Sequence, residues 1–160
     1  MTEVYLALGS NVGDSRGYIK RAIELLGTKL VNLKQAPLYR SKAVGYTDQP
    51  DFLNTAISGQ TNLDSTQLFN FVKETEQQVG RVARFRWGPR EIDIDIIFYG
   101  DQIIKTNQLT IPHPRFAKRD FVLRPLAYLN PVFEDPISHK TVQQLLDQLS
   151  PDDLSVQSSD

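Results

Sequence analysis

The segment at residues 91–99, EIDIDIIFY, constrains the fold more than any other part of this sequence. Its isoleucines alternate with Asp93 and Asp95, and a period of two residues predicts a β-strand. Successive strand side chains point to opposite faces, so the two carboxylates must share one face of a sheet. Because a strand this apolar belongs near the centre of a sheet, the repulsion between the aspartates needs an explanation. Either that face is solvated, or the pair binds a cation.

The rest of the chain supplies the neighbours of this strand. Hydrophobic runs bounded by turn residues predict four strands, at 4–11, 33–44, 52–61 and 91–99. Helical spacing predicts two helices between them, one capped by Asp14 or Ser15, the other capped by Asp64 or Ser65 and ended by Gly80. The order β-α-β-β-α-β predicts an α+β, ferredoxin-like core, an antiparallel sheet with both helices on one face.

The last 60 or so residues extend this core. An extended pair is expected in 102–114, an apolar segment that cannot be a surface loop lies at 121–129, and a helix is expected in 139–149. We therefore predict one catalytic domain over residues 1–160, with its core at about 4–149 and a frayed polar tail at 150–160.

Composition narrows the class of protein. The formal net charge is −1, which gives no reason to expect nucleic acid or a membrane as a partner. There is no cysteine, so disulfides and thiolate metal sites are excluded, as fits a reducing cytoplasm. The N-terminal residues lack the basic region of a signal peptide, and no apolar run approaches the ~20 residues that span a bilayer. We expect a cytoplasmic monomer.

The paired aspartates fit a magnesium site. Mg²⁺ prefers oxygen ligands and commonly uses one or two carboxylates together with substrate phosphates. A D-x-D pair alone is weak evidence, because sugar-nucleotide transferases and other Mg²⁺ enzymes carry it too. The neighbouring sequence favours phosphate chemistry, since four arginines fall within ten residues before the pair: Arg81, Arg84, Arg86 and Arg90.

Two further groups could complete a site. His113 lies between two prolines and is followed by three cations, Arg115, Lys118 and Arg119. Such a cluster is expected of a second wall of a phosphate site. No P-loop motif is present. Three aromatic residues and an amide could bind a planar heterocycle: Phe52, Asn54, Trp87 and Phe121. On residue type alone, core packing is slightly favoured for Phe52 and Phe121.

These motifs together resemble the 6-hydroxymethyl-7,8-dihydropterin pyrophosphokinases of folate biosynthesis. The resemblance covers residue 4 to about 131 and lies in four blocks in family order: ALGSN (7–11), DQPDFLN (48–54), RWGPREIDIDII (86–97) and PHPRFAKRDFVLRPL (112–126). It implies transfer of pyrophosphate from ATP to the hydroxymethyl oxygen of the pterin, with release of AMP. It also implies that Asp93 and Asp95 bind two Mg²⁺ ions that span the ATP phosphates.

The resemblance assigns the remaining roles residue by residue. It implies catalytic roles for Asp93, Asp95, Arg81, Arg84 and Arg90. It implies ATP contacts from Glu76, Arg81, Arg84, Trp87, Arg90, Ile96, His113 and Arg119. It implies pterin contacts from Ser41, Val44, Phe52, Asn54, Trp87 and Phe121. The resemblance also implies that the loop at residues 81–90 is mobile and closes over ATP.

This chain departs from the family pattern at three places. The Arg81–Trp87 loop is one residue shorter than in some relatives, so either Arg84 or Arg86 could be the second loop arginine. Lys42 and Ala43 stand where proline is frequent, and Pro114 replaces a tyrosine of some members. Each departure affects one wall of the expected site.

Two other functions remain open at this stage. A ferredoxin-like module could bind single-stranded nucleic acid, stacking bases on Trp87 among the loop arginines. The carboxylates beside those arginines oppose it, because they repel a phosphate backbone. A D-x-D sugar-nucleotide transferase is the third hypothesis, although such enzymes are normally larger.

Overall fold

The computed structural model describes residues 1–82 and 84–159. Ala83, within the expected 81–90 loop, and Asp160, at the end of the expected tail, lie outside the described residues. The main sheet contains β1 (Thr2–Ser10), β2 (Val31–Gln35), β3 (Tyr39–Ser41), β4 (Phe52–Thr61), β5 (Asp93–Tyr99) and β8 (Val156–Ser159). A second, two-stranded sheet pairs β6 (Ile104–Lys105) with β7 (Thr110–Ile111). The helices are α1 (Ser15–Leu26), α2 (Ser65–Val79), α3 (Asp120–Leu129) and α4 (Val142–Asp147), with 3₁₀ turns η1 (Phe116–Lys118) and η2 (Pro151–Asp153).

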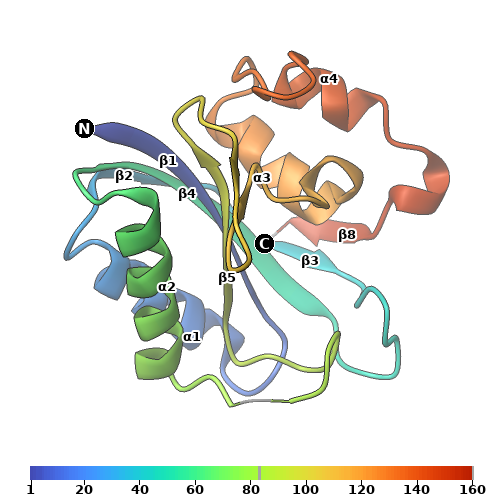
Figure 1. Ribbon diagram of the computed structural model, residues 1–160. Coiled ribbons are helices and arrows are strands. Elements are labelled where there is room, and N and C mark those ends of the chain that lie inside the picture. Colours follow the sequence, from blue (N-terminus) through green and yellow to red (C-terminus); the bar gives the residue numbers. More distant parts are fainter. Residues whose placement is uncertain (83, 160) are drawn as a thin grey trace.

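The strand order confirms the predicted ferredoxin-like core. In the described residues the sheet runs β5-β1-β4-β3-β8, and β2 also pairs with β4. The pairs among these strands are antiparallel, so the chain crosses from β1 to β2 and from β4 to β5 through α1 and α2. β1 lies between β4 and β5, so the aspartate strand is at the edge of the sheet and the expected position near its centre is wrong (Figure 1). The strand is apolar because its residues pack in the cores on both faces of the sheet, Ile94 and Ile96 on one and Ile97 and Phe98 on the other.

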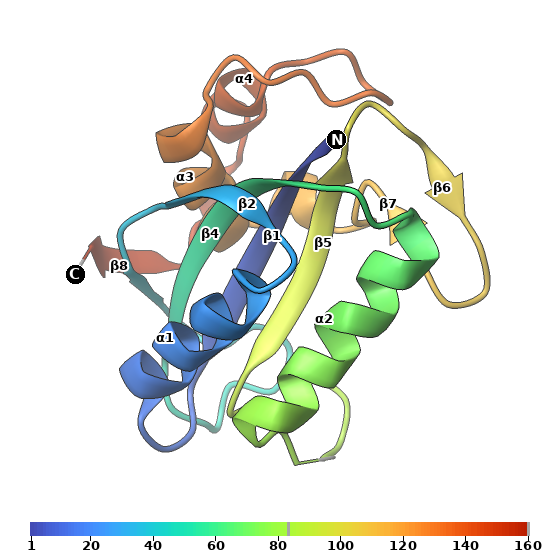
Figure 2. The same ribbon diagram turned by 90° about the vertical axis from the view of Figure 1, so that its left-hand side faces the viewer.

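Helices cover the two faces of the sheet differently. α1 and α2 lie together on one face, as predicted, while α3 and α4 lie on the other (Figures 1 and 2). Under α1 and α2 the core includes Leu6, Leu8, Ile94 and Ile96. Under α3 and α4 a smaller core includes Tyr5, Ala7, Ile97, Phe98 and Leu123. The second core covers only part of its face of the sheet. Residues near the end of β1 and at the start of β4 and β5 remain partly exposed to solvent on that face.

Local sequence sets the helix boundaries. Asp64 accepts the backbone N–H of Gln67 at 2.8 Å and Gln67 accepts that of Asp64 at 2.9 Å, a capping box that starts α2. Gly80 ends α2 in the left-handed region at φ 118°. α1 begins after Asp14, whose carboxylate accepts the N–H of Gly17. These boundaries agree with the caps predicted from the sequence.

Two segments differ from expectation. The predicted strand at 33–44 is two strands, β2 and β3, because residues 36–38 around Pro37 leave the regular ladder. Residues 150–160 were expected to be frayed, yet the described part contains η2 and the strand β8, which pairs with β3. Across residues 1–82 and 84–159, none of the helices has the length and apolar character needed to cross a bilayer.

Candidate active site

Small residues of β1 form the floor of the site. Gly9 pairs with Asp93 of β5 on one side and with Asn54 of β4 on the other. Two residues earlier, Ala7 lies opposite Asp95. These side chains share the face that α3 and α4 leave partly uncovered, because alternate strand residues point the same way. Alanine and glycine beside the carboxylates leave space above the sheet.

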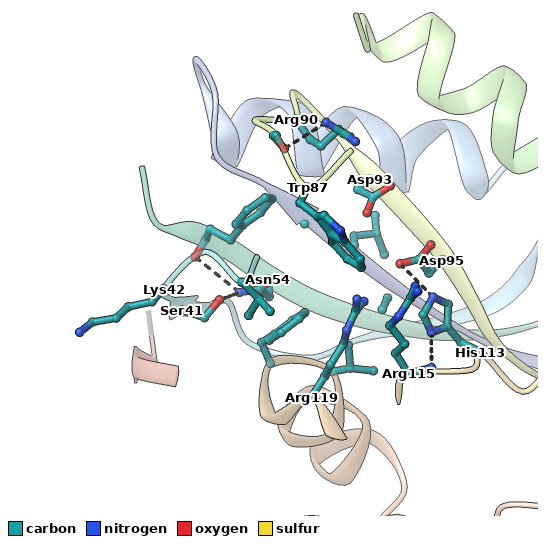
Figure 3. Close-up of a pocket in the computed structure, with 18 of the residues that line it drawn as sticks. Ser41, Lys42, Asn54, Trp87, Arg90, Asp93, Asp95, His113, Arg115 and Arg119 are labelled. Carbon is teal, nitrogen blue, oxygen red and sulfur yellow. Dashed lines mark hydrogen bonds and ion pairs between the residues drawn. The ribbon is translucent and has the colours of Figure 1, made fainter. Parts of the chain in front are cut away.

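A cavity of about 260 Å³ occupies that space. It is lined by Ala7, Leu8, Gly9, Ser41, Lys42, Val44, Phe52, Asn54, Arg81, Arg86, Trp87, Gly88, Arg90, Asp93, Asp95, His113, Arg115, Arg119, Phe121 and Val122. In Figure 3 the carboxylates, His113 and Arg115 gather at one end, and Ser41 and Asn54 lie at the other. The cavity thus has a charged end and a neutral polar end.

Most residues predicted from the sequence meet in this cavity. They are Ser41, Val44, Phe52, Asn54, Arg81, Trp87, Arg90, Asp93, Asp95, His113, Arg119 and Phe121. Three predicted residues are absent from its lining. Ile96 packs in the core beneath α1 and α2, Glu76 is buried on α2, and Arg84 is held by Glu91.

The two carboxylates disfavour each other's charge. Burial and the charge of Asp93 raise the pKa of Asp95 to about 7, against the opposing charge of Arg119. Neither carboxylate has a close ion pair with these neighbours, since Arg81 lies 4.0 Å from Asp93 and His113 Nε2 lies 3.9 Å from Asp95. Over the described residues no group of three or more His, Cys, Asp or Glu side chains could hold a metal alone. A cation here would take its other ligands from water or a substrate.

His113 is neutral and has a defined tautomer. Burial, followed by the charges of Arg119 and Arg115, lowers the pKa of His113 to about 4. Its Nδ1 accepts the backbone N–H of Arg115 at 3.2 Å, so the ring proton lies on Nε2, which faces Asp95. His113 can therefore donate a hydrogen bond into the charged end at neutral pH.

Arginines surround the ring of Trp87. The guanidinium carbons of Arg86 and Arg115 lie 4.9 Å from the ring centroid, and that of Arg119 lies 5.7 Å away. Burial lowers the pKa of Arg119, while the Asp95 charge acts in the opposite direction. These distances are typical of cation–π contacts, so the Trp87 ring offsets part of the repulsion among the three guanidinium groups.

Glu76 of α2 binds the backbone of the aspartate strand β5. It is 1% exposed and accepts the N–H of Ile94, between the two aspartates, at 2.8 Å. Its carboxylate also lies 3.2 Å from Lys73 and 3.8 Å from Arg81. Burial raises the pKa of Glu76, and the Lys73 charge opposes that shift. Glu76 thus joins α2 to β5 and reaches Arg81 at the edge of the cavity.

The loop before β5 is anchored at both ends. Arg84 donates to both oxygens of Glu91, at 2.7 and 2.6 Å, and these bonds lower the pKa of Glu91 to about 2. Further along, the N–H of Arg90 donates to Asn11 Oδ1 at 2.8 Å. Arg86 and Trp87, between these anchors, line the cavity while Arg84 does not.

The loop between β3 and β4 contacts the loop before β5. Gln49 Nε2 donates to the carbonyl of Trp87 at 2.7 Å, and its Oε1 accepts from Asn11 Nδ2 at 2.9 Å. The rings of Tyr46 and Phe85 make an edge contact at 5.0 Å. The two loops are thus joined beside the cavity.

At the neutral end, Asn54 is fixed by hydrogen bonds. Its Nδ2 donates to Ser41 Oγ at 2.8 Å and to the carbonyl of Tyr39 at 3.2 Å. Phe52 and Phe121 also line the cavity. A fixed amide and two aromatic rings in one cavity suit recognition of a planar polar ring.

Sequence reasoning missed several lining residues. Ala7, Leu8, Gly9, Lys42, Gly88 and Val122 line the cavity but were given no role in a site, whereas Arg115, which also lines it, was expected in the second wall of a phosphate site. The alternation of small residues in the first strand was a usable signal for Ala7 and Gly9. That these two residues lie in the site follows only from the strand register, which places them opposite the aspartates.

The family model described as 7,8-dihydro-6-hydroxymethylpterin-pyrophosphokinase (HPPK) matches residues 5–131. The 2-amino-4-hydroxy-6-hydroxymethyldihydropteridine pyrophosphokinase of Aquifex aeolicus (strain VF5) is 46% identical over 144 residues, 90% of either chain. The protein of the same description from Bacillus subtilis (strain 168) is 42% identical over 125 residues, 77% of this chain and 75% of that one.

Solved structures agree at the level of the fold. A Plasmodium falciparum HPPK-DHPS triple mutant superposes with a TM-score of 0.75 at 15% identity, and the match covers 92% of this chain but only 43% of that longer one. The family model covers well over half of the chain, and the two bacterial relatives exceed 40% identity. The chain therefore belongs to the 7,8-dihydro-6-hydroxymethylpterin-pyrophosphokinase family.

Proposed function

We propose that this protein transfers the pyrophosphoryl group of ATP to the hydroxymethyl oxygen of 6-hydroxymethyl-7,8-dihydropterin in folate biosynthesis, releasing AMP. The observation that carries the proposal is the two-ended cavity. One end brings Asp93 and Asp95 together with arginines, and the other offers Asn54 and aromatic rings. An enzyme that joins a polyphosphate to a planar heterocycle needs both ends in one cavity.

The carboxylates fit bound Mg²⁺. Two oxygen ligands that repel each other, with no third acidic ligand in the described residues, suit a cation whose other ligands are phosphate oxygens. We propose that Asp93 and Asp95 hold two Mg²⁺ ions when ATP is present. Bound there, the metal would neutralise phosphate charge and help align the reacting groups.

The cations of the cavity account for the rest of the phosphate site. Five side chains that can donate hydrogen bonds line the cavity: Arg81, Arg86, Arg90, Arg119 and neutral His113. We assign them to the phosphate oxygens, where guanidinium groups bind in two-point fashion. Since Arg84 is bound to Glu91, Arg86 is the better candidate for the second loop arginine.

The remaining predicted contacts act at the edges of this site. Glu76 would act indirectly, through its contacts with Arg81 and with the backbone of β5. Ile96, a residue of β5, would hold that strand in place by packing in the core on the face opposite the cavity. Val44 and Ser41 would wall the pterin, with Asn54 reading its amide edge between Phe52 and Phe121.

The reaction needs alignment more than a strong base. The hydroxymethyl oxygen attacks the β-phosphorus, the bond from that phosphorus to the α-β bridging oxygen breaks, and AMP leaves with the bridging electrons. The hydroxyl proton leaves to solvent. Closure of the Trp87 loop over the cavity would exclude water and limit hydrolysis of ATP.

The nucleic-acid alternative has less support. A backbone-binding surface presents its cations outward, whereas Arg84 is neutralised by Glu91 and Arg81 lies near Asp93 and Glu76. The monomeric state and a cytoplasmic location remain proposals that accompany the main one.

Substitution of the metal carboxylate tests the assignment. In D95A, formation of AMP from ATP and the hydroxymethyl-pterin should fall by at least about a thousandfold, because the phosphate charge is no longer neutralised. Circular dichroism should show an intact fold. D101A, at an exposed acid just after β5, is the matched control and should retain activity. Near-normal turnover in D95A would refute the metal assignment.

A further inference from the structure

Asp120 is a buried charge that the reaction does not use. It is the first residue of α3 and is 1% exposed. Its carboxylate accepts three hydrogen bonds from the C-terminal segment, from Ser155 N at 2.8 Å, Ser155 Oγ at 2.6 Å and Val156 N at 2.8 Å. A carboxylate buried in this way is stabilised only while its donors stay in place. The start of α3 therefore depends on the segment around Ser155.

Ser155 binds a second element at the same time. Its carbonyl accepts the N–H of Lys42 at 3.1 Å, directly after β3. The next residue, Val156, pairs with Ser41 as β8 joins the edge of β3. Ser155 is thus a bridge that holds the beginning of α3 and the end of β3 together.

Both bridged elements carry walls of the cavity. Arg119 and Phe121 flank Asp120, and Ser41 and Lys42 stand at the other end of the bridge; these four side chains line the cavity. Ser41 also accepts the hydrogen bond that orients Asn54, at 2.8 Å. A displacement of either element would change the width of the pterin end and the orientation of its amide.

We infer that Asp120 and Ser155 are positioning residues for the pterin, and that the segment from Ser155 to Ser159 acts as a strap that sets the spacing of that end. The inference rests on the proposed function. β3 is only three residues long, and a strand this short gains order from pairing on both of its edges, with β4 and β8. The strap lies beyond residues 5–131, the part that the family model matches.

Paired substitutions at Ser155 test the strap with little risk to folding. S155A removes one hydrogen bond to Asp120 and leaves both backbone bonds, whereas S155T retains the hydroxyl. We expect S155A to raise the KM for the pterin about fivefold, with the KM for ATP changed less than about twofold. D120N should raise the KM for the pterin about tenfold or more and the KM for ATP by a smaller factor, because Arg119 adjoins Asp120. S155T should remain close to the parent protein. Q157A, at an exposed side chain of β8, is the control.

Hydrogen exchange separates this inference from the proposed function. In S155A and D120N, amides of residues 39–44 and 119–122 should exchange faster, while those of β1 and β5 should not change. Unchanged exchange at 39–44 would overturn the strap, whether or not the parent protein is active. Equal rises in both KM values would also overturn it, since they indicate a general structural role. A parent protein without pterin-dependent release of AMP would instead refute the function.

Discussion

At the scale of single residues, the charged form of Asp95, which we propose as a metal ligand, lowers the stability of the folded chain. Its surroundings raise its pKa to about 7, well above the ordinary value of 3.8. A folded-state pKa that is raised in this way contributes stability below the ordinary pKa and loses it as the pH rises through the folded-state value. Without a cation, the charged form of Asp95 therefore destabilises the protein above about pH 7.

D95N should remove this penalty while abolishing activity. In the absence of Mg²⁺ at pH 8, we expect its unfolding temperature to exceed that of the parent protein by about 2–4 °C. Near pH 4 the two proteins should unfold at the same temperature, because Asp95 is then largely protonated. Thermal unfolding followed by circular dichroism across pH measures this. A lower midpoint for D95N at pH 8 would contradict the electrostatic account.

Gly9 tests the geometry of the neutral end. A Cβ at this position would lie 3.3 Å from Asn54 Oδ1 and 3.5 Å from Phe52 Cδ1, so an alanine would push on the amide. We expect G9A to raise the KM for the pterin about tenfold, equivalent to about 1.4 kcal/mol, with little effect on the KM for ATP. Steady-state kinetics with each substrate varied would decide. An effect confined to ATP would place the pterin elsewhere.

At the scale of elements, the ion pair between Arg84 and Glu91 is one of the contacts that fix the loop between α2 and β5. Glu91 has a pKa of about 2, below its ordinary value of 4.5, chiefly because Arg84 donates to it. A depressed pKa contributes stability above the ordinary value and loses it as the pH falls toward the folded-state value. The anchor should therefore hold at neutral pH and weaken between about pH 4.5 and pH 2.

E91Q should lower the unfolding temperature at pH 7 by about 2–4 °C, and this difference should shrink as the pH falls below about 4.5. If Arg84 only anchors the loop, R84A should lose less activity than R86A. Chemical or thermal unfolding across pH, together with kinetics of the two arginine variants, provides the measurement. A larger loss of activity in R84A would reassign the second loop arginine.

The elements themselves were largely predictable. The α2 boundaries follow from Asp64 and Gly80, and the strand at 52–61 was predicted at the bounds where it occurs. Local chemistry determines such features, so sequence pattern reveals them. The ordered tail was not predictable, because its polar residues form a strand only by pairing with β3 and binding Asp120. Such tertiary contacts leave little periodic trace in the sequence.

At the scale of the whole molecule, the fold brings four distant segments to one cavity. Asp93 and Asp95 could be placed on one face from their spacing, and most other site residues followed from the family resemblance. Sequence did not reveal that Arg84 faces Glu91 while Arg86 lines the cavity, since both are exposed loop arginines of the same charge. The direction of a loop side chain depends on partners that only the structure identifies.

The fate of the ATP phosphates tests the central claim most directly. With Mg²⁺, the hydroxymethyl-dihydropterin and ATP labelled at the γ-phosphate, the label should enter the pterin product and AMP should form in equal amount. Neither should appear when the pterin or Mg²⁺ is omitted. Release of ADP with a singly phosphorylated pterin, or labelled phosphate formed without any pterin product, would contradict pyrophosphoryl transfer by this protein.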